Sequence, residues 1–232
     1  MKIERREFLE KTLVGAAGLV ALMRGMKATA QNLPSDKEAK TAASGPGEIV
    51  LPAFEKNSAF TLDHALMARK TSRNFDKDAA ITREQLSRIL WAANGVNRPD
   101  GKRVTPSALH LYPISVYAAL KEGVYLYQPD GHKLKRVSGQ DIRDQIAAQL
   151  ALNKAALQLL YVINPSKLTG ADDWMAVLEI GCMVQDVYLQ AAALGLGSCG
   201  FAFARYEAAS KAMGLKSGQK LRFAQAVGPI MS

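Results

Sequence analysis

One long helical segment with almost no polar face constrains the fold of this chain more than any other feature. Residues 173–194 are apolar on nearly every side of a helix. The polar interruptions are Asp173, Glu179, Gln185, Asp186 and Gln190. They are too many for a membrane span, and a helix without a polar face is stable only in a core or in a subunit interface. We therefore expect a buried or interfacial helix over 173–194, which Gly195 and Gly197 end.

The segments around this helix show strand and helix patterns in irregular order. A nearly continuous apolar run at 157–163 predicts a strand in the middle of a sheet. Other strands are expected at 114–120, 124–127, 133–137, 198–203 and 221–227, and helices at 61–69, 82–93, 141–152 and 206–213. Because helices and strands do not alternate strictly, an α+β domain is favoured over a doubly wound sheet.

Residues 1–30 have the order of features of an export signal. Arg5-Arg6 stand before an uncharged run at 13–23, and Ala28-Thr29-Ala30 gives the small-x-small pattern of a cleavage site. The run is too short to span a bilayer of about 30 Å. The layout resembles a twin-arginine (Tat) signal peptide, which predicts a periplasmic protein without a stable membrane span after cleavage. The alternatives are an amphipathic first helix of the mature fold and a retained N-terminal anchor.

The charge left after cleavage does not indicate a nucleic-acid partner. Residues 1–30 hold six basic and three acidic residues, so their removal lowers the net charge from +9 to +6. The remaining cations are dispersed, without zinc-finger spacing or a basic heptad. Residues 31–52, rich in Ala, Ser, Gly and Pro, read as a flexible linker, and 53–232 as one folded domain.

Cysteine and histidine spacing gives no metal site. Cys182 and Cys199 do not form a C-x-x-C motif, and they are either buried free thiols or a disulfide. His64, His110 and His132 share no ligand spacing, so no metal is expected. Without a G-x-S-x-G elbow, serine hydrolysis has no candidate nucleophile.

A run of cations and hydroxyls follows the first helix of the domain. The segment Arg69-Lys70-Thr71-Ser72-Arg73-Asn74-Phe75 places three cations and two hydroxyls within five residues. Guanidinium groups and hydroxyls together suit a phosphate. The simpler interpretation is that cations favour the C-terminal end of a helix.

Two further segments complete a family pattern. They are Pro106-Ser107-Ala108-Leu109-His110-Leu111-Tyr112-Pro113 and the helix with its end, residues 178–197. In order and spacing the three segments resemble the motifs R-x-[ST]-x-[RK]-x-F, P-S-A-G-A-L-Y-P and G-x-x-x-Q-N-x-x-L-x-A-x-x-x-G-L-G of the nitroreductase family of FMN flavoproteins. The resemblance covers about residues 58–228 and is closest to the branch of peptide thiazole/oxazole dehydrogenases.

The resemblance implies a fold and a cofactor. The fold is a central, mostly antiparallel sheet flanked by helices, with the long helix at a homodimer interface. FMN would be held between the two subunits. It implies that the phosphate and ribityl chain are held by Arg69, Lys70, Thr71 and Arg73. It also implies that the partner subunit reaches the isoalloxazine with Pro106, Ser107 and Ala108, although Pro106-Ser107 is also an ordinary turn before a strand.

Further site residues follow from the same resemblance. Gly197, Gly200, Phe201 and Ala202 would lie along the flavin, with backbone N–H groups of 200–202 directed at N5. His110 would face a small-molecule substrate, or else be a packed side chain. No catalytic side chain is implied, because hydride passes through flavin N5 between an unknown donor and an organic acceptor.

The chain departs from the family pattern at two places. Leu109 and His110 replace small residues of the second motif. Family members commonly continue past the last strand into a basic segment, whereas this sequence stops at 232. Phosphate binding would then depend on 69–73, with Lys220 or Arg222 as possible helpers. These departures leave open a flavin- or ligand-binding protein without turnover, and an unrelated α+β interaction protein.

Overall fold

The computed structural model describes residues 47–56, 59–169, 172–202 and 204–231. Seven strands in this part of the chain form one antiparallel sheet in the order β1-β4-β3-β2-β5-β7-β6. The strands are β1 (Glu48–Val50), β2 (Ile114–Leu120), β3 (Gly123–Gln128), β4 (Lys133–Ser138), β5 (Leu157–Ile163), β6 (Gly197–Phe201) and β7 (Lys220–Gly228). The α+β class and the mostly antiparallel sheet are thereby confirmed.

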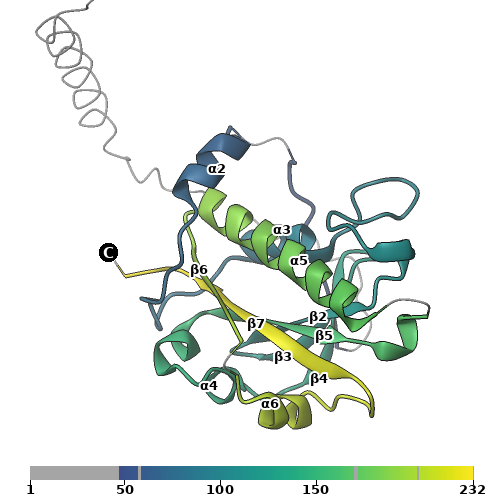
Figure 1. The fold of residues 1–232 in the computed structure, drawn as a ribbon. Coiled ribbons are helices and arrows are strands. Elements are labelled where there is room, and N and C mark those ends of the chain that lie inside the picture. Colours follow the sequence, from purple (N-terminus) through teal and green to yellow (C-terminus); the bar gives the residue numbers. More distant parts are fainter. Residues whose placement is uncertain (1–46, 57–58, 170–171, 203, 232) are drawn as a thin grey trace, which may run out of the picture. The chain divides into compact units, whose positions relative to one another are not determined.

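Helices cover both faces of the sheet. They are α2 (Leu62–Ala68), α3 (Arg83–Asn94), α4 (Arg143–Ile146), α5 (Asp173–Ala193) and α6 (Tyr206–Ala212), with short 3-10 turns η1 (Ala108–His110), η2 (Leu150–Lys154) and η3 (Pro165–Lys167). Figure 1 shows α3 and α5 on one face and α4 and α6 on the other. Residues of β5 alternate accordingly: Leu159 and Tyr161 pack toward α5, while Leu160 and Val162 pack toward α4 and α6. This strand is buried along its whole length, as its apolar run predicts.

Local sequence signals explain where α3 begins. Thr82 accepts a hydrogen bond from the backbone N–H of Gln85 at 3.1 Å, and the Gln85 side chain accepts from the N–H of Thr82 at 2.8 Å. This capping box satisfies two N–H groups that a helix start otherwise leaves unpaired. The helix predicted at 82–93 is confirmed within one residue.

The helix expected over 141–152 is wrong. The structure has only the four-residue α4 and the 3-10 turn η2 there. Between them Ala147 leaves the helical conformation, because its backbone forms a bridge with Ala204 and its N–H donates to the side chain of Asn153 at 3.2 Å. Tertiary pairing outweighs the local helical pattern at this position.

Strand pairing also begins earlier than residue 53, where the domain was expected to start. β1 pairs with β4, so the last residues of the expected linker 31–52 belong to the sheet. Leu51 is buried in the core beside them. The predicted export signal and residues 31–46 lie outside the described residues.

The long helix α5 confirms the prediction for 173–194 to within one residue. One face, with Ala176, Ile180 and Met183, is buried against the sheet and α3, but Trp174 and Leu178 on the other side are 58% and 61% exposed. The helix is therefore not covered on all sides by its own chain. Among the described helices none is long and apolar enough to cross a membrane.

Candidate functional site

The cationic loop after α2 is held against the edge strand β6. Thr71 forms a parallel bridge with Ser198, and the Ser72 N–H donates to the Ser198 carbonyl at 2.8 Å. At the end of the loop Phe75 is 1% exposed and forms a bridge with Ile230. The aromatic residue of the first motif is thus an anchor. It fixes the loop between β6 and the segment that follows β7.

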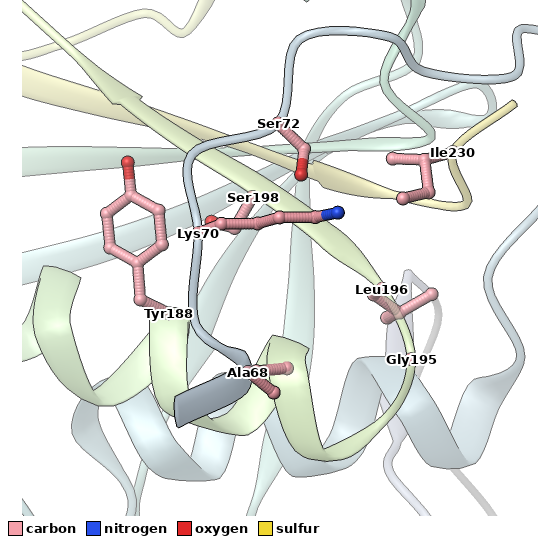
Figure 2. Close-up of a pocket in the computed structure, with 9 residues that line it drawn as sticks. Ala68, Lys70, Ser72, Tyr188, Gly195, Leu196, Ser198 and Ile230 are labelled. Carbon is pink, nitrogen blue, oxygen red and sulfur yellow. The ribbon is translucent and has the colours of Figure 1, made fainter. Parts of the chain in front are cut away.

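A cavity of about 190 Å³ lies under this loop. Its walls are Ala68, Lys70, Ser72, Tyr188, Ala192, Gly195, Leu196, Ser198 and Ile230. Figure 2 shows the side chains of Lys70 and Ser72 near Ser198, with Tyr188 at the left of the view and Ile230 at the right. Residues 70 and 72 share a wall because side chains alternate along an extended segment. Ser72, Ser198 and Tyr188 were not among the predicted site residues.

Within the described ranges, no acidic side chain pairs with the cations of this loop. None of the ion pairs among the described residues uses Arg69, Lys70 or Arg73. The Arg69 guanidinium lies 5.4 Å from the centre of the Tyr188 ring. A cation and two hydroxyls that converge on one cavity are what a phosphate-sized anion requires.

A second cavity of about 240 Å³ lies between α2, α3 and α5 and is less suited to an anion. Its lining includes the acidic residues Glu55 and Asp186, and its Arg88 pairs with Glu84 at 3.1 Å. We therefore place the candidate site at the first cavity.

Tyr188 links the loop to β6. Its hydroxyl accepts the backbone N–H of Gly200 at 2.7 Å and lies 3.5 Å from the Thr71 hydroxyl. The N–H of Gly200, expected to point at a flavin, is therefore engaged within the chain. A single tyrosine in an apolar helix has no sequence signal that would have identified it.

The glycines of β6 are explained by packing inside the chain. A Cβ on Gly197 would collide with Ile230 and lie 2.9 Å from the Ser72 Cβ, and one on Gly200 would lie 2.9 Å from the Phe223 ring. Phe201 is buried and Ala202 is exposed at the end of the strand. Gly195 has φ +68° at the end of α5, which agrees with the helix-cap interpretation.

The second predicted segment, Pro106-Ser107-Ala108, lies at the other end of α5. Ser107 interacts with Glu179, whereas Thr71 lies at Tyr188. The two helix positions are nine residues apart, or about 13 Å along the axis. The structure therefore does not bring these two predicted groups together within one chain.

The turn after Ser107 is strained. Leu109, His110 and Tyr112 have φ of 53°, 55° and 45°. Each left-handed non-glycine residue costs about 1–2 kcal/mol. Leu109 occupies the position where the family motif has glycine, and its side chain is 70% exposed. His110 is exposed too, which disagrees with the packed-side-chain alternative.

Two carboxyl groups of α5 are withdrawn from water beside this segment. Burial raises the pKa of Glu179 to about 7, against the lowering effects of a Ser107 hydrogen bond and of the Arg103 and Lys167 charges. Burial also raises the pKa of Asp186, whose Oδ2 lies 3.1 Å from the Thr105 hydroxyl. Neither residue was a predicted site residue.

The possible helpers Lys220 and Arg222 do not reach the cavity. They lie at the beginning of β7, whereas Gly228 at its end pairs with Gly197 beside the cavity. Eight residues of strand span about 26 Å. Lys220 instead lies 3.4 Å from Asp173 at the start of α5. Within one chain the structure therefore does not bring these two residues to the cavity.

Cys182 and Cys199 are free thiols in the structure, on α5 and β6 respectively. In the part of the chain that is described, no cluster of three or more His, Cys, Asp or Glu residues could hold a metal ion. The site offers hydroxyls and cations instead.

Comparison with known proteins gives a consistent result. The sequence pattern described as "Nitroreductase family" matches residues 66–229. A protein of Methanocaldococcus jannaschii classed with the nitroreductases is 32% identical over 165 residues, which is 65% of this chain and 81% of that protein.

Solved structures show the same fold. The crystal structure of a Ralstonia eutropha JMP134 protein, also classed with the nitroreductases, has a TM-score of 0.76 and 30% identity, and the match covers 83% of this chain and 94% of that one. The NADPH:FMN oxidoreductase of Vibrio harveyi has a TM-score of 0.55 and 18% identity, with 74% and 69% of the two chains covered.

Proposed function

This chain belongs to the nitroreductase family of oxidoreductases, and from that premise we propose that it is an FMN-dependent enzyme. One observation carries the proposal: three cations without an acidic partner among the described residues stand on a loop over a cavity that Lys70, Ser72 and Ser198 help to line. The Vibrio harveyi oxidoreductase, which has the same fold, is described by name as acting on FMN.

The residues around the cavity fit the phosphate end of FMN. Lys70 and Ser72 would bind the phosphate oxygens, and Arg69, Thr71 and Arg73 would line the approach. The Ser198 hydroxyl accepts a hydrogen bond from the Gln225 side chain at 2.9 Å, so only its O–H is left to donate to the phosphate. At about 190 Å³ the cavity is smaller than the roughly 300–1,000 Å³ of complete ligand pockets. The isoalloxazine would therefore lie outside it, along β6 at Phe201 and Ala202.

A second subunit would complete this site. Trp174, Val177 and Leu178 of α5 and Leu66 and Met67 of α2 are exposed apolar residues on helices that pack together. A surface of this kind is typical of an interface. Within one chain, Pro106, Ser107 and Ala108 lie far from the cavity. If they contact a flavin, as the family resemblance implies, it would be the flavin of the partner in a homodimer formed there.

FMN, when bound, supplies two-electron hydride chemistry at N5. The chain binds and orients it, and no side chain of the site is needed as a catalytic base. His110 and Leu109, exposed on the strained turn, would face an organic acceptor. The motifs favour the peptide thiazole/oxazole dehydrogenase branch within the family.

One observation favours a second candidate function, a flavin-binding protein without turnover. The Gly200 N–H, which would otherwise polarise N5, donates to Tyr188. The two functions are distinguished by loading the protein with FMN, reducing it with an artificial donor and adding quinone or nitroaromatic acceptors. Enzyme function predicts repeated turnover, whereas a carrier gives at most one reduction for each bound flavin.

We infer from residues 1–30 that the protein is exported by the twin-arginine route and works in the periplasm, with a retained anchor as the alternative. Replacing Arg5 and Arg6 by Lys is expected to leave the chain in the cytoplasm, as cell fractionation would show. Normal export of that double variant would contradict the inference.

A further inference from the structure

One carboxyl group in the structure is buried without full hydrogen bonding. Glu179 is 4% exposed, and within the described part of the chain its Oε1 has no hydrogen-bond partner. A buried carboxylate normally has every oxygen paired, because an unpaired charge in a low-dielectric interior is costly. Glu179 therefore differs from a residue selected only to stabilise the core.

The other contacts of Glu179 lead to the strained turn. Helix α5 packs against η1, and hydrogen bonding by the Ser107 hydroxyl lowers the pKa of the Glu179 carboxyl group. The same Ser107 oxygen accepts the backbone N–H of Tyr112 at 2.9 Å. Ser107 also accepts, with its carbonyl oxygen, the N–H of His110 at 3.1 Å. One serine thus connects the buried carboxyl group to both sides of the turn with three left-handed residues.

The charged neighbours of Glu179 come from other elements. Arg103, from the loop before η1, lies 4.2 Å from the Tyr112 ring centre and donates to Asn94 of α3 at 3.2 Å. Lys167, from η3, lies 3.4 Å from the Tyr112 carbonyl oxygen. On α5 itself Cys182 and Asp186 are the neighbouring titratable groups. The two cations that act on Glu179 therefore also contact the turn.

We propose that Glu179 is a positioning residue: its ionised carboxylate, acting through the Ser107 hydroxyl, holds the turn over residues 107–112 and makes flavin and substrate binding at that turn depend on pH. The proposal rests on the proposed function, because only that function places the turn at a flavin.

The direction of the effect follows from the hydrogen bonds. Ionised Glu179 can only accept, so the Ser107 O–H donates to it and the serine lone pairs remain free for the Tyr112 N–H. Protonated Glu179 can itself donate to the Ser107 oxygen and compete with Tyr112. Since a chain of hydrogen bonds ending on a charge is stronger than a neutral one, the turn is held more firmly when Glu179 is ionised. Because burial raises the pKa of Glu179 to about 7, the carboxyl group changes its ionisation close to neutral pH.

The direct test is amide hydrogen exchange of the full chain without added flavin, between pH 5.5 and 8.5. After correction for the intrinsic exchange rate, protection of the Tyr112 N–H is expected to rise about tenfold across this range. Glu179→Gln should make the protection independent of pH, and Ser107→Ala should remove it at every pH. Glu84→Gln, at an exposed site on α3, should behave like the wild type.

A second measurement separates this proposal from the proposed function. Affinities for FMN and for riboflavin, which lacks the titrating phosphate, are measured over the same pH range. Riboflavin should bind several-fold more tightly at pH 8 than at pH 6 to the wild type, and equally at both to Glu179→Gln.

Each outcome decides one of the two claims. Identical exchange profiles for the wild type and Glu179→Gln would overturn the role of Glu179. A pH-dependent turn in a protein that binds neither flavin would confirm the link between Glu179 and the turn, but would overturn the proposed function and with it the effect on binding.

Discussion

Three basic side chains without an acidic partner in the described structure, Arg69, Lys70 and Arg73, supply the positive charge of the proposed phosphate site. The structure adds a contact for two of them: Arg69 lies over the Tyr188 ring, and Lys70 lines the cavity. Ser72 and Ser198 also line the cavity of the proposed anion site.

Arg69→Ala combined with Arg73→Ala is expected to lower the affinity for FMN at least about tenfold, because two positive charges beside the phosphate are lost. Neither side chain is buried, so the free energy of unfolding should change by no more than about 0.5 kcal/mol. Flavin fluorescence quenching and urea unfolding give the two quantities. Lys211→Ala with Lys216→Ala removes the same charge elsewhere and should bind FMN normally. An equal loss of FMN affinity in that control would show that net charge, and not the position of Arg69 and Arg73, determines the affinity.

Glu179→Gln is expected to change how stability depends on pH. The folded pKa of about 7 lies above the ordinary value of 4.5, so the folded state keeps a proton that the unfolded state loses. Wild-type stability is complete below pH 4.5 and falls until about pH 7. The variant should not show this loss. Its free energy of unfolding, relative to that of the wild type, should therefore rise by about 3 kcal/mol between pH 4 and pH 8. Urea unfolding at a series of pH values measures it, and parallel curves would contradict the assigned pKa.

At the scale of elements, β6 brings the loop, α5 and the segment after β7 together. Its glycines permit this approach, and Gly197 is the tightest position, with Ile230 and Ser72 directly against its missing side chain. A helix and an edge strand thus form the cavity by close backbone contact, to which the cationic loop then adds charge.

Gly197→Ala is expected to destabilise the protein by about 1–3 kcal/mol, because the new methyl group must displace Ile230 or Ser72. The matched control is Gly181→Ala on α5, where an added Cβ meets nothing within 4 Å. There the same substitution should stabilise the helix by up to about 1 kcal/mol. Urea unfolding of both variants measures the difference. Equal effects would show that β6 tolerates a side chain at 197.

How well each element could be predicted depends on what fixes it. The strand at 157–163 and the helix at 82–93 follow from an apolar run and a capping box, which are local signals. The segment 141–152 does not follow its local pattern. Its helix ends early because Ala147 pairs with Ala204, which is distant in the sequence. Tyr188 and Glu179 escaped prediction for a related reason. Their roles depend on Gly200 and Ser107, which come near only in the folded chain.

At the scale of the whole molecule, the incomplete cavity and the exposed apolar side of α5 lead to one conclusion. In the described part of one chain, the cavity of the proposed phosphate site holds about 190 Å³, which is less than a ring system together with its phosphate requires. A second copy packed on α5 would supply the missing wall.

Leu178→Glu is expected to convert a dimer into monomers, because a charge would be buried at the proposed interface, and FMN should be lost with the dimer. Leu178 is 61% exposed, so the monomer should remain folded by circular dichroism. Light scattering with detection of flavin absorbance measures both effects. Leu150→Glu, at a 71% exposed leucine of η2, is the control that should stay dimeric with flavin bound. A flavin-loaded monomer would contradict the shared site.

On the proposed function, the chain holds FMN in a site shared by two subunits. The decisive experiment is the absorbance spectrum of the protein purified from cells, with acid release of the chromophore, its identification by mass, and light scattering of the same sample. We expect one FMN per chain in a dimer. A colourless protein that also takes up no added FMN would contradict the claim and leave only the fold of the family.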